Sequence, residues 1–279
     1  MKRVYAIGDI HGHLDWLHLV HGWIEADHQS HRGDYVVVHV GDLTDRGPES
    51  AGVIQFLIDG LSMDQPWVAL RGNHDRMMSM YLGTPAQNDP KLRSDYSWLH
   101  HRLGGLTTLA SYGVLPAEET NPKIPIGKHW LHPKSGGRET LTSYGIDLNS
   151  VDDLDLAKAA RAAVPGEHQA FLAGLDTMYR TKDVVFVHAG IRPGVALEDQ
   201  VEDDLIWIRE PFLGDATDHG PLIIHGHTPV ETPIHYGNRV NIDSGVAFGG
   251  PLSVVVVEGR DIWNLTAEGR TALLPIRHQ

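Results

Sequence analysis

The 279-residue sequence contains no cysteine, which excludes a disulfide framework, a thiol nucleophile and a zinc site built on thiolates. It also lacks any apolar stretch approaching the ~20 residues that are needed to cross a bilayer. The first expected strand begins by Arg3, which leaves no room for the charged and apolar regions of a secretory signal. Together these absences predict a soluble, cytoplasmic protein without a membrane partner.

Positive charge is scarce as well. The chain has 23 Lys and Arg against 36 Asp and Glu, a formal net charge of −13, and its basic residues form no cluster. Because binding a nucleic-acid backbone requires a positive surface, the charge balance argues against general nucleic-acid binding as the function. An anionic substrate is not excluded, since bound metal ions can reverse the sign of the local field.

Short apolar runs alternate with helical patterns, which predicts a layered α/β core. Strands are expected at residues 4–7, 35–40, 68–70, 184–187, 222–224, 239–242, 252–257 and 261–265. Helices are expected at 13–26, 49–61, 75–82 and 154–180, the last broken near Pro165-Gly166. No helix separates the final strands, so we expect them to pair antiparallel as a second sheet. The length favours a single domain, residues 1–279, that carries an insertion.

The inserted segment, residues 85–150, is rich in Gly, Pro, Ser and Thr and contains a twofold repeat. Ten positions between Trp98 and Gly113 recur 32 residues later, between Trp130 and Gly145. Two copies are too few for a solenoid, which needs three or more. The repeat at residues 98–146 forms either a cap over the core or a purely structural insertion.

Five of the expected strands are each followed by Asp, Asn or His beside a glycine. The five runs are Gly8-Asp9-Ile10-His11-Gly12, Gly41-Asp42-Leu43-Thr44-Asp45-Arg46-Gly47, Arg71-Gly72-Asn73-His74-Asp75, His188-Ala189-Gly190 and His225-Gly226-His227-Thr228. In open α/β sheets, ligands bind beyond the carboxyl ends of the strands, so these runs are expected to meet at one site. The glycines allow the backbone to turn sharply there.

Six side chains of these runs are candidate metal ligands: Asp9, His11, Asp42, Asn73, His188 and His227. Mixed nitrogen and oxygen ligands without sulfur suit Mn, Fe, Zn or Co better than an all-oxygen Ca or Mg cage. Six ligands are too many for one ion that must keep open positions. A carboxylate that bridges two ions ~3.5–4 Å apart resolves the count. Such a centre favours a phosphate dianion, and a bridging hydroxide could attack its phosphorus.

Each motif alone has an ordinary structural explanation. Asp9 and His11 could belong to a turn or a helix cap, and His188 could be a hydrogen-bonded histidine of the core. The five motifs in this order nevertheless predict one binuclear metal site.

These motifs, which run from residue 8 to residue 228, resemble those of the calcineurin-like metallophosphoesterases. Within that family they resemble the phosphoprotein-phosphatase branch, particularly bacterial and phage serine/threonine phosphatases of the lambda-phosphatase type. The resemblance implies a four-layer α/β/β/α sandwich. It further implies that Asp9, His11 and Asp42 hold the first metal and that Asp42 bridges. The second metal would be held by Asn73, His188 and His227.

The resemblance also implies roles for four other side chains. His74 would be the general acid that protonates the leaving group, with Asp45 hydrogen-bonded to it, and histidine is suited to this because it exchanges a proton near neutral pH. Arg46 would grip phosphate oxygens, for which a planar guanidinium is better shaped than an ammonium. A second phosphate-binding arginine, Arg209, is supplied by the run Ile206-Trp207-Ile208-Arg209-Glu210.

The last motif reads Gly226-His227-Thr228-Pro229, without the second histidine that is common in the wider superfamily. This favours the phosphoprotein-phosphatase branch over the nucleases and phosphodiesterases. The resulting prediction is a metal-dependent phosphomonoesterase that acts on phosphoserine or phosphothreonine proteins or on small phosphoesters. It would use two divalent ions, with manganese preferred to iron, zinc or cobalt.

Two other functions are alternatives to this prediction. The first is hydrolysis of nucleotides or dinucleoside polyphosphates, as in the diadenosine tetraphosphatases. Asp45 argues only modestly against it, because the symmetrical enzymes tend to lack this aspartate while other nucleotide-cleaving relatives keep it. The second is a metal-binding interaction protein without catalysis, which is disfavoured because every catalytic position is filled.

Overall fold

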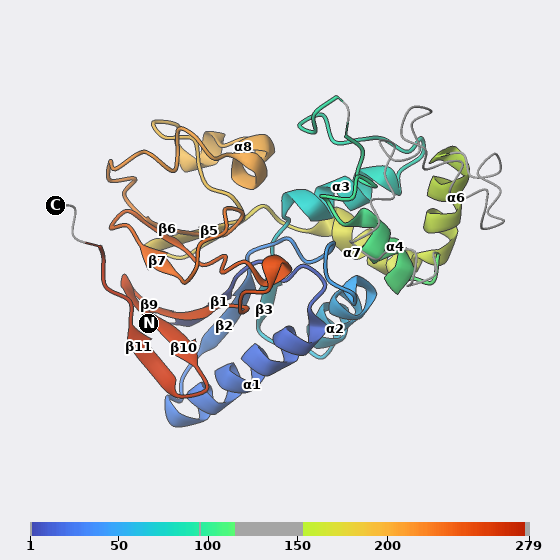
Figure 1. The fold of residues 1–279 in the computed structure, drawn as a ribbon. Helices are drawn as coiled ribbons and strands as arrows, with labels where there is room; N and C mark the ends of the chain where they lie inside the picture. Colours follow the sequence, from blue (N-terminus) through green and yellow to red (C-terminus); the bar gives the residue numbers. More distant parts are fainter. Residues whose placement is uncertain (1, 95, 115–152, 277–279) are drawn as a thin grey trace.

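Two β-sheets packed face to face form the centre of the molecule (Figure 1). The computed structural model describes residues 2–94, 96–114 and 153–276. Within these residues the first sheet has six strands in the order β11-β10-β9-β1-β2-β3. The strands are β1 (Arg3–Ile7), β2 (Tyr35–His39), β3 (Trp67–Ala69), β9 (Val254–Glu258), β10 (Asp261–Thr266) and β11 (Gly269–Ala272). The first three are parallel to one another, and β9 runs antiparallel to β1.

The second sheet has five strands in the same described ranges, in the order β4-β5-β6-β8-β7. They are β4 (Met178–Arg180), β5 (Val184–Val187), β6 (Leu222–His225), β7 (Ile234–His235) and β8 (Arg239–Asn241). Its three central strands, β5, β6 and β8, are parallel, and its two edge strands are antiparallel to their neighbours.

The prediction that the final strands form a second sheet by themselves is wrong. Strands β9 and β10 do pair antiparallel, but β9 also pairs with β1 and thereby extends the first sheet. The second sheet is built instead around β5, β6 and β8. The reason is that β9 is apolar on both faces: Val254 and Val256 pack toward the helices, while Val255 and Val257 pack between the sheets. Such a strand belongs inside a layered core.

Alternation along the strands produces four layers. In β2, Val36 and Val38 face the second sheet, where they meet residues such as Phe186 and Ile224. Val37 faces the other way, toward the helices that cover the first sheet. On the outer face of the second sheet, Val185, Val187 and Ile223 pack with residues of α8 and the loop that follows it. The predicted α/β/β/α sandwich is therefore confirmed.

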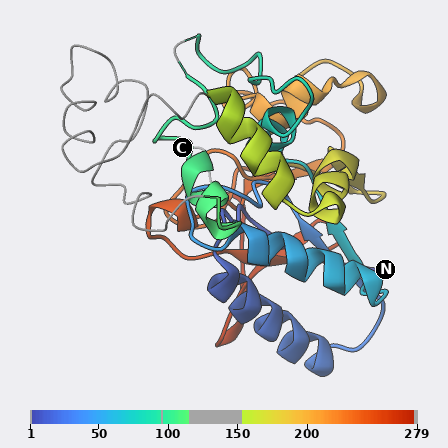
Figure 2. The same ribbon diagram turned by 90° about the vertical axis from the view of Figure 1, so that its right-hand side faces the viewer.

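The helices cover the two outer faces and the end of the sandwich. They are α1 (Leu14–Ser30), α2 (Ser50–Ser62), α3 (Asn73–Tyr81), α4 (Gly105–Ser111), α6 (Asp153–Ala163), α7 (Gly166–Gly174) and α8 (Glu202–Trp207). Seen from the side in Figure 2, α1, α2 and α6 lie one above another. The helix expected at 154–180 is wrong in its last part. It ends at Gly174, because Met178 to Arg180 pair with β5 as an edge strand.

The first copy of the repeat belongs to the main core. The side chain of Trp98 is fully buried in the cluster that also contains residues of α1 and α2. Ser111, at the end of α4, accepts a hydrogen bond from the backbone N–H of Ala51 in α2 at 3.1 Å. The second copy, residues 130–145, lies outside the described residues. The assignment of residues 85–150 to a cap therefore stays a prediction.

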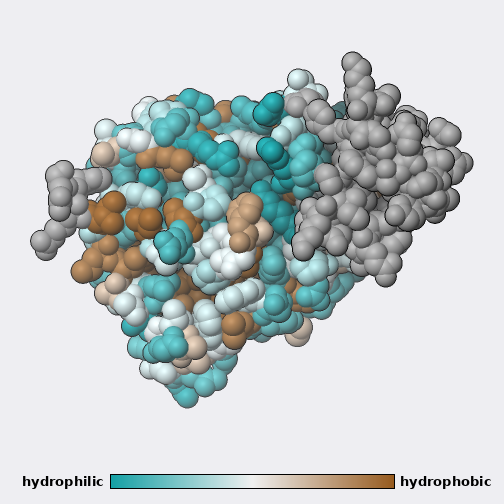
Figure 3. All heavy atoms as spheres, in the orientation of Figure 1, coloured by the Kyte–Doolittle hydropathy of each residue, from teal (hydrophilic) through white to brown (hydrophobic). Residues whose placement is uncertain are grey.

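The segment that follows β11 exposes hydrophobic side chains. On the face shown in Figure 3, hydrophobic residues gather where the chain leaves this strand, and Leu274 and Ile276 there are 75% and 46% exposed. Among the described residues, no helix combines the length and the apolar character that crossing a membrane requires.

Candidate metal centre

The six predicted metal ligands come together at the carboxyl ends of the parallel strands. They follow β1, β2, β3, β5 and β6, and all are buried. Their exposed fractions are 3% for Asp9, 2% for His11, 2% for Asp42, 3% for Asn73, 0% for His188 and 6% for His227. Burying polar and charged groups in this way is unfavourable unless each finds a partner.

Two groups of possible ligands share Asp42. One contains His11, Asp42 and His74, and the other contains Asp42, His188 and His227; within each group the ligand atoms lie within 4.8 Å of one another. Asp42 Oδ2 is 3.4 Å from His11 Nε2, and its Oδ1 is 3.3 Å from His188 Nε2. The amide oxygen of Asn73 lies 3.0 Å from the same nitrogen of His188. Each oxygen of Asp42 thus faces a different half of the site, an arrangement that allows this carboxylate to bridge two ions.

In each of the three histidines (His11, His188 and His227), an imidazole nitrogen is available to donate its lone pair to a metal ion. Nδ1 of His11 donates to the carbonyl of Thr44 at 2.9 Å, and Nδ1 of His188 donates to that of Val40 at 3.1 Å. Those hydrogen bonds leave each Nε2 as the unprotonated atom. Nε2 of His227 is buried without a hydrogen-bond partner in the described part of the chain. Burial lowers the pKa of all three imidazoles, which favours their neutral forms. These donors fit divalent cations.

Carboxylates concentrate negative charge at the same place. Burial disfavours the ionised form of Asp42, yet the neighbouring histidines, His188 foremost, hold its pKa below the ordinary value. Burial, followed by the charges of Asp243 and Asp42, raises the pKa of Asp9. Carboxylates that raise one another's pKa in this way mark a place where positive charge would be stabilising.

Asp9 belongs to neither of the two ligand groups, although it contacts His227 of the second. Its two carboxylate oxygens accept the backbone N–H of His227 at 3.2 and 3.1 Å. His74, rather than Asp9, completes the group with His11 and Asp42 in this arrangement. The assignment of Asp9 to the first metal stays a prediction.

Sequence reasoning missed Asp243, which is 4% exposed. It lies just beyond β8, two residues before Gly245, whose N–H donates to its Oδ1 at 2.9 Å. An Asp, Asn or His close to a glycine after a strand is the signal that identified the other five loops, so this residue could have been found.

The predicted acid and its partner lie in contact. His74 Nδ1 is 2.7 Å from Asp45 Oδ2 and donates to it. The same oxygen accepts the indole N–H of Trp98 at 2.8 Å, and the other oxygen accepts the hydroxyl of Thr108 at 2.7 Å. Asp45 is fully buried, so these three donors replace its hydration. Neither Trp98 nor Thr108 was predicted to belong to the site, and both come from the first repeat copy.

Arg46 joins the acid to the metal ligands. Its Nη1 lies 2.6 Å from Nε2 of His11, and its Nη2 lies 3.0 Å from Nε2 of His74. Its Nε is buried without a partner among the described residues. Arg46 therefore keeps an unused, buried N–H donor that an anion could accept.

Arg209 lies near the other side of the centre. It is exposed and follows α8. Burial foremost lowers the pKa of His227, and the positive charge of Arg209 adds to that effect. Burial foremost raises the pKa of Asp243, and the charge of Arg209 opposes that rise. Arg46 is thus in direct contact with the centre, whereas Arg209 acts on His227 and Asp243 through its charge. Their binding of phosphate stays a prediction.

The backbone is strained where the site residues are placed. In the described part of the chain, the non-glycine residues with left-handed φ are His11, Asp42, Asp45, Arg46, Asp64 and His227. All but Asp64 belong to the predicted site. Such conformations cost of order 1 kcal/mol or more each and persist where the surrounding structure fixes a side chain for a function.

Two glycines permit the close approach of the loops. A Cβ on Gly72 would lie 2.1 Å from both the backbone nitrogen and Oδ1 of Asp42, and a Cβ on Gly226 would lie 1.9 Å from Oδ1 of Asp9. The carboxylate of Asp75 then links the loop after β2 to the loop after β3. It accepts the N–H groups of Gly72 at 2.9 Å and of Leu43 at 3.0 Å.

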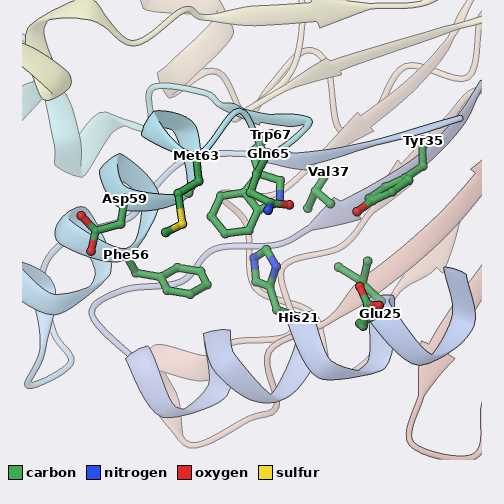
Figure 4. A pocket seen from close by; sticks show the side chains of 11 residues that line it. His21, Glu25, Tyr35, Val37, Phe56, Asp59, Met63, Gln65 and Trp67 are labelled. Carbon is green, nitrogen blue, oxygen red and sulfur yellow. The ribbon is translucent and has the colours of Figure 1, made fainter. Parts of the chain in front are cut away.

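A cavity lies at the opposite ends of the strands, between α1 and α2. It has a volume of about 370 Å³, and Figure 4 shows the rings of Trp67, Phe56 and His21 facing the same space. Its lining includes Glu25 and Asp59 but no lysine or arginine. The acidic lining of this cavity makes it unsuited to binding a phosphate.

The geometry agrees with comparisons to known proteins. The model of the calcineurin-like phosphoesterases matches residues 2–156, which is more than half of the chain and includes the first three motifs. The chain belongs to the calcineurin-like phosphoesterase family. It is therefore a metallophosphoesterase, one of a family of hydrolases that use divalent metal ions.

Within this family the chain is similar to bis(5′-nucleosyl)-tetraphosphatases named PrpE, of the asymmetrical type. It is 30% identical over 254 residues to the protein from Anoxybacillus flavithermus (strain DSM 21510 / WK1), covering 89% of this chain and 88% of the relative. It is 29% identical over 217 residues to the one from Geobacillus thermodenitrificans (strain NG80-2), covering 77% and 73%.

Solved structures share the fold of this metallophosphoesterase. A protein described as a diadenosine tetraphosphatase has a TM-score of 0.55 and 18% identity, covering 98% of this chain and 94% of its own. A cold-active protein tyrosine phosphatase has a TM-score of 0.56 and 16% identity, covering 99% and 79%.

Proposed function

We propose that this phosphoesterase hydrolyses dinucleoside tetraphosphates, cleaving them asymmetrically into a nucleoside triphosphate and a nucleoside monophosphate. The observation that carries the proposal is the similarity to a PrpE tetraphosphatase over 89% of this chain and 88% of the relative. Hydrolysis of dinucleoside polyphosphates is thus preferred to hydrolysis of phosphoserine and phosphothreonine.

The site is suited to a polyphosphate. We assign Asp9, His11 and Asp42 to one divalent cation and Asp42, Asn73, His188 and His227 to the other, with manganese the preferred metal. Such cations would offset phosphate charge and bring the pKa of water toward neutrality. Without them the centre carries buried carboxylates that repel an anion, so binding of substrate and binding of metal are expected to depend on each other.

Arg46 and Arg209 would orient the polyphosphate from the two sides of the centre. Arg46 offers its unpartnered Nε and can exchange its contacts with His11 and His74 for phosphate oxygens. In hydrolysis, the oxygen of a water bonds to phosphorus, and the bond from phosphorus to the bridging oxygen breaks. The leaving nucleotide keeps the electron pair on that oxygen.

His74 would supply a proton to the leaving oxygen through Nε2, while its Nδ1 stays bonded to Asp45. This pair is also what favours the second candidate function, hydrolysis of phosphoserine or phosphothreonine. A serine alkoxide is a far stronger base than a nucleotide phosphate, so it needs an acid more. An intact Asp45–His74 pair is therefore suited to both substrates.

Product analysis tests the proposal. The purified chain would be stripped of metal, reloaded with Mn²⁺ and incubated with a diadenosine tetraphosphate, and the nucleotides would be separated by chromatography. Equal amounts of ATP and AMP are expected. Two molecules of ADP would contradict asymmetric cleavage, and an intact substrate beside rapid release of phosphate from a phosphopeptide would favour the second candidate.

A further inference from the structure

An aromatic ring stands exposed beside the candidate phosphate-binding arginine. The side chain of Phe248 is 70% exposed, and the guanidinium carbon of Arg46 lies over its ring, 5.1 Å from the centroid. Phe248 is the only aromatic residue among the exposed large hydrophobic residues in the described part of the chain. Leaving such a ring in water forgoes ~1.5–3 kcal/mol of burial, so its position calls for an explanation.

The loop between β8 and β9 holds the ring outward. Phe248 ends the short helix η3 (Val246–Phe248), whose first residue, Val246, is 3% exposed and packs in the main core. The N–H of Phe248 donates to the carbonyl of Gly245 at 2.8 Å, and the N–H of Gly250 donates to the same oxygen at 3.0 Å. An anchored turn of this kind fixes the side chain two residues beyond the anchor.

The same loop begins inside the candidate metal centre. Asp243 precedes Phe248 by five residues and packs against the loop of Asp9, since a Cβ on Gly8 would lie 3.6 Å from the Cα of Asp243. Its Oδ1 accepts the N–H of Gly245 at 2.9 Å. The exposed ring therefore belongs to the rim of the centre rather than to a distant surface. It lies where the part of a substrate next to the bound phosphate would extend.

We propose that Phe248 is the stacking platform for a nucleobase of the substrate. The inference rests on the proposed function and deepens it, because it names the part of the chain that reads the nucleoside. A base stacks on an aromatic face, and the neighbouring guanidinium of Arg46 adds a cation–π interaction and holds the adjoining phosphate. One rigid contact thus connects recognition of the base to recognition of the phosphate. A phosphoserine or phosphothreonine side chain lacks the flat group that would use it.

A base-free ligand separates this role from mere support of Arg46. Phe248→Ala and Phe248→Trp would be compared with the parent in the full-length, Mn²⁺-loaded protein. Calorimetry would give the dissociation constants of ATP and of inorganic tripolyphosphate, and kinetics would give kcat/KM for diadenosine tetraphosphate. The matched control is Met63→Ala, since Met63 is 67% exposed but lies in the cavity between α1 and α2.

Phe248→Ala is expected to weaken ATP binding and to lower kcat/KM, each by roughly 5- to 150-fold, which is the range of one base–aromatic stack. Tripolyphosphate binding should change less than about 2-fold, and Phe248→Trp should retain parental values. Equal weakening of both ligands would overturn the inference in favour of support for Arg46, and so would an unchanged ATP affinity. If the parent protein does not cleave the dinucleotide, the proposed function is wrong, and the inference that rests on it is wrong too. If the parent cleaves it and only the Phe248 results differ from expectation, the inference alone is wrong.

Discussion

Removing one donor from Asp45 tests how the candidate acid is held. In Thr108→Val, a methyl group replaces the hydroxyl that donates to Oδ1 of Asp45 at 2.7 Å, at nearly constant volume. Trp98→Phe removes the indole N–H that donates to Oδ2 at 2.8 Å. Hydrogen bonds to charged groups contribute ~1.5–3 kcal/mol each, so either change should lower the free energy of unfolding by about 2 kcal/mol. Trp98→Phe should cost somewhat more, because a smaller ring leaves a void in a fully buried site.

The catalytic consequence depends on the leaving group. If Asp45 shifts, His74 is no longer oriented to donate its proton. General acid catalysis contributes ~10²–10⁴-fold, and loss of an outer hydrogen bond removes on the order of 10-fold of it. The loss should appear with poor leaving groups and almost vanish with activated ones, which depart without a proton.

The assay is a series of aryl phosphates whose phenols differ in pKa, with Mn²⁺ saturating. A plot of log kcat/KM against the pKa of the phenol should be shallow for the parent and steeper for Thr108→Val and Trp98→Phe. His74→Asn should be the steepest. Thr108→Ser, which keeps the hydroxyl, is the matched control and should follow the parent. Parallel lines for all variants would refute the reasoning, because a loss independent of the leaving group cannot arise at the acid.

Three further predictions concern the centre and the fold. Asp42→Asn should abolish activity and reduce bound manganese, measured by elemental analysis, because each of its oxygens faces one histidine; a fully active variant would sink the binuclear site. Gly72→Ala should prevent stable folding in urea titrations, since its Cβ would lie 2.1 Å from Asp42, whereas Gly22→Ala in α1, with nothing within 4 Å, should add ~0.5–1 kcal/mol of stability. Burial lowers the pKa of His39 to about 4. The neutral imidazole therefore contributes its full share to the free energy of unfolding above pH 6.5, the ordinary pKa of histidine, and this contribution is lost as the pH falls toward 4. The difference corresponds to ~3 kcal/mol, and Tm should fall from pH 7 to pH 5, less steeply in His39→Gln; identical slopes would contradict this.

The local chemistry of the site could be read from the sequence because it is repeated locally. Each strand end carries its own Asp, Asn or His beside a glycine, and parallel strands bring such ends to one edge. Asp243 shares this signal. The four-layer architecture likewise follows from alternation in strands such as β2, whose two faces meet different layers.

What could not be read depends on partners distant in the chain. Trp98 and Thr108 lie 53 and 63 residues from Asp45, and nothing around them indicates which carboxylate they will meet. The pairing of β9 with β1 spans nearly the whole chain, and an apolar period shows that a strand is buried without naming its neighbour. From the sequence alone, Phe248 would be expected in the core. In the fold, Val246, two residues earlier, is buried in the core, and Phe248 is exposed.

The most direct measurement offers the metal-stripped chain an equimolar mixture of diadenosine tetraphosphate and a phosphoserine peptide, with and without added Mn²⁺. The proposed function predicts that ATP and AMP appear only with the metal, and that kcat/KM for the dinucleotide exceeds that for the peptide. Cleavage that proceeds without metal, or phosphate released from the peptide while the dinucleotide stays intact, would contradict it.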